Sequence, residues 1–122
     1  MALIGLDKEE TFEYISRFDK DKNNPTIFLL GVLSGKDKLK FIEDAFTADG
    51  NLDIKKLQSK SYDIVKTGLK GIKNLYNKKT GKYEHITEIT EEVLDKLPTV
   101  VVTELAGKII EINYLTKEEE KN

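Results

Sequence analysis

Two glycines inside a segment with the pattern of an amphipathic helix constrain this chain most. Over residues 53–76, apolar side chains recur in one arc at about 100° per residue, and lysines fill the opposite arc. The pattern predicts one long helix. A glycine inside a helix costs about 1 kcal/mol relative to alanine, so Gly68, near the middle of the apolar arc, predicts that a neighbouring strand or helix approaches closely. Gly71 lies between the two faces, where the pattern offers only a kink as its reason.

Length and composition limit the classes of protein to consider. The chain has 122 residues, which fits one domain, and we expect a single α+β domain over residues 1–115 with a polar acidic tail at 116–122. It has no cysteine, which excludes disulfides and thiolate metal sites. A net charge of −2 gives no overall field that attracts nucleic acid. The longest apolar run, residues 27–33, is too short to span a bilayer, and we expect no membrane partner.

Alternating and β-branched segments predict the strands. Residues 11–18 alternate with Phe12, Tyr14 and Phe18 on one face, which predicts a half-buried strand. Residues 26–33 predict a more buried strand that pairs with the first across a polar loop ending in Asn24-Pro25. A turn at Thr80-Gly81 then predicts a further strand over residues 82–86.

Capping residues place three more helices. Ser34 predicts the N-cap of a helix, Thr90 that of a short helix ended by Pro98, and Thr99 that of a last helix. The first of these has apolar residues at helical spacing: Leu39, Ile42 and Phe46, with Phe41 and Ala45 beside them. The last has a similar stripe: Val101, Leu105, Ile109, Ile112 and Leu115. The expected fold is α+β: a small, mainly antiparallel sheet of two to four strands, packed against the long amphipathic helix and a C-terminal helical pair.

No motif in the chain has complete catalytic or ligand-binding spacing. The run from Gly31 to Lys36 has three residues between its glycines and is followed by Asp37, whereas a phosphate-binding loop needs four and a Ser or Thr. Residues 19–30 lack the glycine and the final glutamate of a calcium loop. His85 is the single histidine, and one histidine without cysteines does not make a typical zinc site. We therefore expect no catalytic residues, no cofactor and no metal, and a protein that is not an enzyme.

Charge is unevenly distributed along the chain. Residues 55–82 contain nine lysines and one acid, whereas residues 84–122 contain ten acids and four lysines. The lysine arc could meet the acidic face of the C-terminal helices in a neighbouring copy, as a homo-oligomer, or could follow nucleic-acid phosphates. Arg17 is the sole arginine, and Tyr62 and Tyr76 fall in the apolar arc, so protein contact is favoured over nucleic acid. The candidate interaction face consists of Lys56, Lys60, Lys66, Lys70 and Lys73.

Four pieces of the chain, taken in order, form a recognisable set. They are a strand with Phe12 and Tyr14; Asp19 followed by Asn24-Pro25-Thr26-Ile27-Phe28; Gly68-Leu69-Lys70-Gly71; and a closing pattern of Leu97-Pro98, Glu104-Leu105-Ala106, Ile109, Leu115-Thr116 and Glu118-Glu119-Glu120-Lys121-Asn122. Together these segments resemble small proteins from the virion-assembly genes of tailed bacteriophages. The closing pattern is also similar to the acidic helical end of phage tail assembly chaperones.

This resemblance implies a non-enzymatic role in building the tail or the head–tail junction. The implied partners are other phage virion proteins: the tail tube, the tape measure or the head–tail connector. The implied location is the host bacterial cytoplasm during assembly, or the virion. Two alternatives stay open: a permanent virion component such as a connector or completion protein, and a small phage nucleic-acid-binding or host-modulating protein that uses the basic face over residues 55–82.

Overall fold

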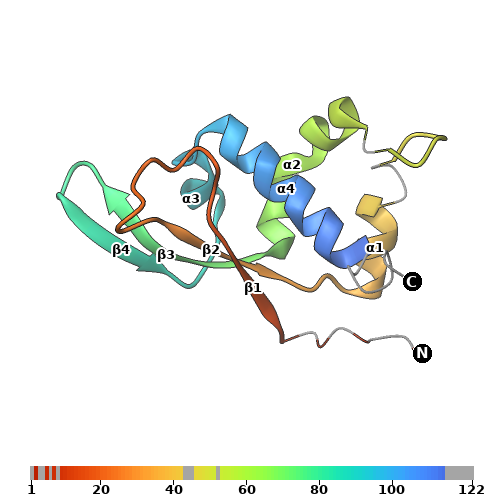
Figure 1. Ribbon diagram of the computed structural model, residues 1–122, viewed down its shortest axis with the longest axis horizontal. Helices are drawn as coiled ribbons and strands as arrows, with labels where there is room; N and C mark the ends of the chain where they lie inside the picture. Colours follow the sequence, from red (N-terminus) through yellow and green to blue (C-terminus); the bar gives the residue numbers. More distant parts are fainter. Residues whose placement is uncertain are drawn as a thin grey trace.

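The protein has an α+β fold, as the sequence predicts (Figure 1). The computed structural model describes residues 9–42, 46–51 and 53–114, together with residues 2, 5 and 7. Ala45, Leu115 and the predicted tail at 116–122 lie outside the described residues. The elements, in chain order, are β1 (Thr11–Tyr14), β2 (Ile27–Gly31), α1 (Gly35–Ile42), α2 (Ile54–Gly68), β3 (Leu69–Asn77), β4 (Lys82–Ile86), α3 (Glu91–Asp95) and α4 (Thr99–Tyr114).

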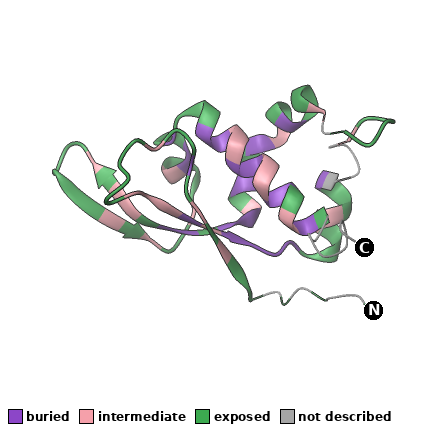
Figure 2. Cartoon of the chain, viewed as in Figure 1, coloured by how far each residue is buried: buried purple, intermediate pink, exposed green. Residues whose placement is uncertain are grey.

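The four strands form one antiparallel sheet in the order β1-β2-β3-β4. Tyr14, Phe28, Ile72 and Ile86 are paired in register across the four strands, so their side chains lie on one face of the sheet. All four contribute to the hydrophobic core or pack against it. Side chains on the other face are more exposed, and within the described residues the helices cover only the first face (Figure 2).

Helix α4 crosses α2 (Figure 1), and the two helices approach closely at Gly68, the last residue of α2. A Cβ atom on Gly68 would lie 2.7 Å from Cγ2 of Ile109 on α4, a distance that real Cβ contacts do not reach. The predicted close approach at Gly68 is therefore confirmed, and the neighbour is the last helix. Val102, Leu105, Ile109 and Ile110 on α4 are completely buried, which makes this helix the centre of the core.

The predicted long helix over residues 53–76 is wrong in its last third. Helix α2 ends at Gly68, and the chain continues directly as β3. The inward residues of β3 are Leu69, Ile72 and Leu75. They are three apart because the strand pairing shifts once opposite Leu29 and Leu30, and again between Ile72 and Leu75. Each bulge adds one residue to the strand. Inward side chains that would be two residues apart in a regular strand are therefore three residues apart here, which is a spacing typical of a helix.

Gly71 is explained by this strand and does not mark a kink. It pairs with Leu29 of β2, and a Cβ atom on it would lie 3.1 Å from the carbonyl oxygen of Ile86 on β4. The second bulge contains Asn74, whose φ is 65°, a left-handed conformation that asparagine tolerates better than most residues. Its amide donates to the carbonyl oxygens of Asn24 and Pro25 at 3.0 and 3.3 Å, which ties the β1–β2 loop to β3.

The predicted caps are confirmed at Ser34 and Thr90, whose hydroxyl oxygens accept hydrogen bonds from backbone N–H groups three residues later. Thr99 is the first residue of α4 rather than its cap, because the carbonyl of Pro98 accepts the first bonds of that helix. Leu39 was expected in an apolar stripe, but it is 70% exposed. Helix α1 has only eight residues, and Phe41 enters the core from it instead.

The end of α4 is fixed to the end of β2 through Asn113. This buried amide accepts a hydrogen bond from the N–H of Leu33 at 2.7 Å and donates to the carbonyl of Gly31 at 3.1 Å. It also donates to the carbonyl of Ile109 one turn earlier, at 2.8 Å. Every polar atom of this side chain is therefore used, as a buried amide requires.

Candidate functional site

The five lysines of the predicted interaction face do not share one helix. Lys56, Lys60 and Lys66 lie on α2, whereas Lys70 and Lys73 lie on β3. The prediction that one long helix carries all five lysines is therefore wrong, because the chain becomes a strand after Gly68. Tyr62 and Tyr76, which the pattern placed in the apolar arc, are both exposed.

Some of these lysines contact groups within the chain. Nζ of Lys66 lies 3.3 Å from Oε1 of Glu91 on α3, and Nζ of Lys73 lies 3.5 Å from Oε2 of Glu13 on β1. Nζ of Lys70 donates to the carbonyl of Thr67 at 3.2 Å. Exposed pairs of this kind contribute little to stability. They show, however, that some lysines expected to contact a partner lie next to groups of their own chain.

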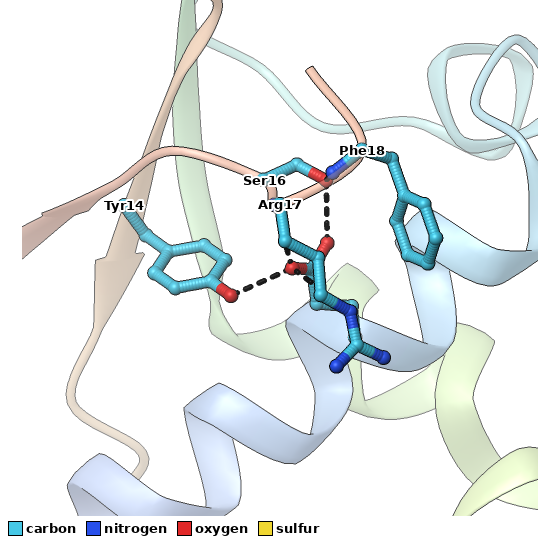
Figure 3. Close-up of polar contacts among 5 residues, drawn as sticks. Tyr14, Ser16, Arg17 and Phe18 are labelled. Carbon is cyan, nitrogen blue, oxygen red and sulfur yellow. Dashed lines mark hydrogen bonds and ion pairs between the residues drawn. The ribbon is translucent and has the colours of Figure 1, made fainter. Parts of the chain in front are cut away.

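A buried carboxylate on α4 holds the segment that follows β1 (Figure 3). The side chain of Glu104 is 6% exposed. It accepts hydrogen bonds from the Tyr14 hydroxyl at 2.7 Å, the Ser16 hydroxyl at 2.5 Å and the Arg17 backbone N–H at 3.0 Å. We call Glu104 and these three donors the Glu104 clasp.

The clasp forms because β1 ends early. The sequence predicts a strand through residue 18, but β1 stops at Tyr14 and the chain turns at Ser16. The Ser16 hydroxyl oxygen also accepts the N–H of Phe18 at 3.1 Å, so it links the turn to the carboxylate. Three donors from one short segment converge on one carboxylate, which fixes the path of residues 14–18 over α4.

The electrostatics of the clasp favour a charged Glu104 and a neutral Tyr14. Burial by itself raises the pKa of Glu104, but hydrogen bonds from Ser16, the Arg17 N–H and Tyr14 outweigh it and hold this pKa below its usual value. Burial, together with the hydrogen bond to Glu104 and its negative charge, raises the pKa of Tyr14 to about 12. At neutral pH the carboxylate is therefore ionised and the phenol keeps its proton.

The clasp presents three residues to solvent, which we call the 15–18 surface: Ile15, Arg17 and Phe18. The side chain of Arg17 is 76% exposed, while Ile15 and Phe18 are 49% and 45% exposed. The Arg17 guanidinium carbon lies 5.1 Å from the centre of the Phe18 ring, within the range of a cation–π contact. Arginine and aromatic side chains are enriched among the residues that dominate binding energy at protein interfaces.

Sequence reasoning missed this site, although a signal was present. Glu104 stands between Val102 and Leu105, in the apolar part of α4, where a lone carboxylate needs a partner. The sequence did not indicate that the partners come from the end of β1, 87 to 90 positions away.

The remaining motifs have structural roles. Asp19 accepts hydrogen bonds from the N–H groups of Asp21 and Thr26, and Asp21 accepts from that of Asn24, so these carboxylates shape the β1–β2 loop. This confirms the polar turn that the sequence predicts. His85 lies exposed on β4. Among the described residues, no group of three His, Cys, Asp or Glu side chains could hold a metal ion.

The described helices include none that is both long and apolar enough to cross a membrane. Comparison with protein-family models, with curated proteins and with solved structures finds no match to this chain.

Proposed function

We propose that this protein is a non-enzymatic assembly protein of a tailed bacteriophage, similar in role to a tail assembly chaperone, and that it acts through protein–protein contacts. Its partners would be other virion proteins, namely the tail tube, the tape measure or the head–tail connector. The observation that carries the binding role is the 15–18 surface, which a buried carboxylate fixes in place.

Preorganisation explains why this surface suits a binding role. Ordering a side chain at an interface costs about 0.5–1.5 kcal/mol, and ordering a loop costs more. In this protein the Glu104 clasp has already fixed the backbone that carries Arg17 and Phe18. Binding of a partner to these side chains would therefore cost less conformational entropy than binding to a flexible loop. The assembly context itself rests on the sequence resemblance.

The distribution of the lysines favours a protein partner over nucleic acid. The lysines expected on one helix face are divided between α2 and β3, and Lys66 and Lys73 contact acids of the same chain. A groove that follows a phosphate backbone needs a continuous track of cations. The basic face over residues 55–82 therefore supports the nucleic-acid alternative less well than the sequence suggests.

Binding measurements with the virion proteins encoded near this gene test the proposal. The purified chain is immobilised, and the tail-tube, tape-measure and connector proteins are passed over it in turn. We expect one of them to bind. We also expect Phe18→Ala to weaken that binding about tenfold or more, since an anchor residue contributes at least about 1.4 kcal/mol.

Leu39→Ala is the matched control, because Leu39 is also an exposed apolar residue but lies on α1. Its binding should equal that of the unaltered protein. If none of the virion proteins binds, the assembly role is refuted. If Phe18→Ala and Leu39→Ala bind equally well, the 15–18 surface is not the contact. Peptides of this chain in purified virions would identify a permanent component instead of a chaperone.

A further inference from the structure

The outer edge of β4 has no partner strand within the described residues. In the sheet order β1-β2-β3-β4, β4 pairs with β3 alone. The β3–β4 hairpin extends beyond the helices at one end of the molecule, and most of β4 is exposed (Figures 1 and 2). An exposed strand edge presents unpaired N–H and C=O groups that can pair with another strand.

The side chains of β4 make this edge complementary to itself. Lys82 and Glu84 are two residues apart and share one face of the strand, while Tyr83 points to the other face. Two such strands placed antiparallel, with Tyr83 opposite Tyr83, bring each Lys82 opposite the Glu84 of the other copy. Opposite charges directly across a strand pair stabilise it. We propose that β4 pairs in this register with β4 of a second copy.

Neighbouring registers lack this complementarity. A shift that places Glu84 opposite Glu84, or Lys82 opposite Lys82, sets like charges across the pair, which is destabilising. We call the face of the sheet that the helices do not cover the open face. If the pairing shifts by one residue, the open face of one copy lies on the same side of the joined sheet as the helix-covered face of the other copy. The register centred on Tyr83 keeps both open faces on the same side and forms one continuous sheet of eight strands.

Neighbouring side chains already hold the key residues in position. The amide of Asn77, on β3, donates to Oε2 of Glu84 at 3.1 Å, which restrains the Glu84 side chain on the face of the sheet that it shares with Lys82. The ring of Tyr83 lies against that of Tyr76, with 5.2 Å between the ring centres. In the paired form, two such tyrosine pairs would stand next to each other on the open face of the joined sheet.

This inference goes beyond the proposed function and can fail separately from it. It concerns β4, whereas the contact with virion proteins is assigned to the 15–18 surface after β1. It also differs from self-association through lysines on α2, which the charge distribution of the sequence suggests.

Charge-swap variants and their mixture test the pairing by sedimentation equilibrium. The unaltered protein should form dimers, and Lys82→Glu alone or Glu84→Lys alone should weaken dimerisation at least tenfold. A one-to-one mixture of the two variants should form heterodimers, because the two acidic side chains of one variant then face the two basic side chains of the other. Lys56→Glu makes the same charge change on α2 and should leave the dimer unaffected. A monomer at every concentration overturns the proposal, as does a mixture that fails to regain dimers.

Single cysteines test the register, since the chain has none of its own. Tyr83→Cys should form a disulfide-linked dimer on mild oxidation, because residues directly opposite are about 4.5–5.5 Å apart at Cα. In the same register two copies of residue 85 are offset by four positions, or roughly 13 Å, which is too far for a disulfide. His85→Cys should therefore stay monomeric on a reducing-agent-free gel. Equal cross-linking of both variants overturns the proposed register.

Discussion

Replacing Glu104 by glutamine tests whether the clasp is held by charge. The substitution keeps the shape of a side chain that is only 6% exposed, but it removes the negative charge and converts one acceptor oxygen into an NH₂ donor. The side chain then has one oxygen to share among the Tyr14 hydroxyl, the Ser16 hydroxyl and the Arg17 N–H. At least one of these donors loses its acceptor.

The expected loss is about 2–3 kcal/mol of unfolding free energy at pH 7. A buried donor without an acceptor costs about 1–3 kcal/mol, and hydrogen bonds to a charged group are at the stronger end of that range. Urea denaturation followed by far-ultraviolet circular dichroism measures this. With a slope of about 1–3 kcal/mol per molar urea for small proteins, the urea midpoint should fall by roughly 0.7–3 M.

The pH dependence identifies the cause of the loss. Because the folded-state pKa of Glu104 is lowered, its contribution is present above the unfolded-state pKa and is lost as pH falls through the folded-state value. The difference between the unaltered protein and Glu104→Gln should therefore be largest near pH 7 and should shrink as the pH falls below the ordinary pKa of a glutamate and through the lowered pKa of Glu104. Glu111→Gln is the control, since that exposed carboxylate meets Lys108 in a surface pair. Equal stability of Glu104→Gln and the unaltered protein at pH 7 would refute the argument.

Three further substitutions test other features of the fold. Gly68→Ala should lower the melting temperature although alanine favours helices, because its Cβ would lie 2.7 Å from Ile109; a raised melting temperature would contradict the close crossing. Asn74→Val should be about 1–2 kcal/mol less stable than Asn74→Gly in urea denaturation, although both variants lose the hydrogen bonds of the amide, because φ at this position is 65° and glycine adopts it without strain; equal stability of the two would contradict the left-handed conformation. Tyr14 has a pKa raised to about 12, so its contribution is full below pH 10 and is lost as pH rises through 12; Tyr14→Phe should be less stable at pH 7 and lack that decline.

The sequence predicts a helix or strand correctly where a single hydrophobic period, a capping residue or a turn determines its position. The caps at Ser34 and Thr90 need only a hydroxyl and the N–H three residues later, and both are present. The stripe of α4 follows from its 3.6-residue period, and its central members are fully buried. Strand β4 has the predicted bounds because a glycine turn at φ 70° starts it.

The errors arise where the chain departs from one period. The two shifts in the pairing of β3 give Leu69, Ile72 and Leu75 a spacing that periodicity alone assigns to a helix. Recognising a bulge requires knowing which strand lies opposite, and that is information about pairing. The glycines were the local warning, since Gly68 ends the helix at a crossing and Gly71 lies against the carbonyl of Ile86.

The two proposed binding surfaces also depend on contacts between residues far apart in the chain, which the local sequence pattern does not indicate. The uneven charges of the sequence suggest an intermolecular contact, but Lys66 and Lys73 meet acids of their own chain. The 15–18 surface instead depends on Glu104, which is 88 positions from Ser16. The edge of β4 depends on the absence of a fifth strand beside it in the described sheet. Variants at Lys56, Phe18 and Lys82 therefore test the lysine face, the 15–18 surface and the β4 edge one at a time. If only Phe18→Ala loses partner binding and only Lys82→Glu loses dimers, the partner contact lies beside the β1 edge of the sheet and the dimer contact lies at the β4 edge.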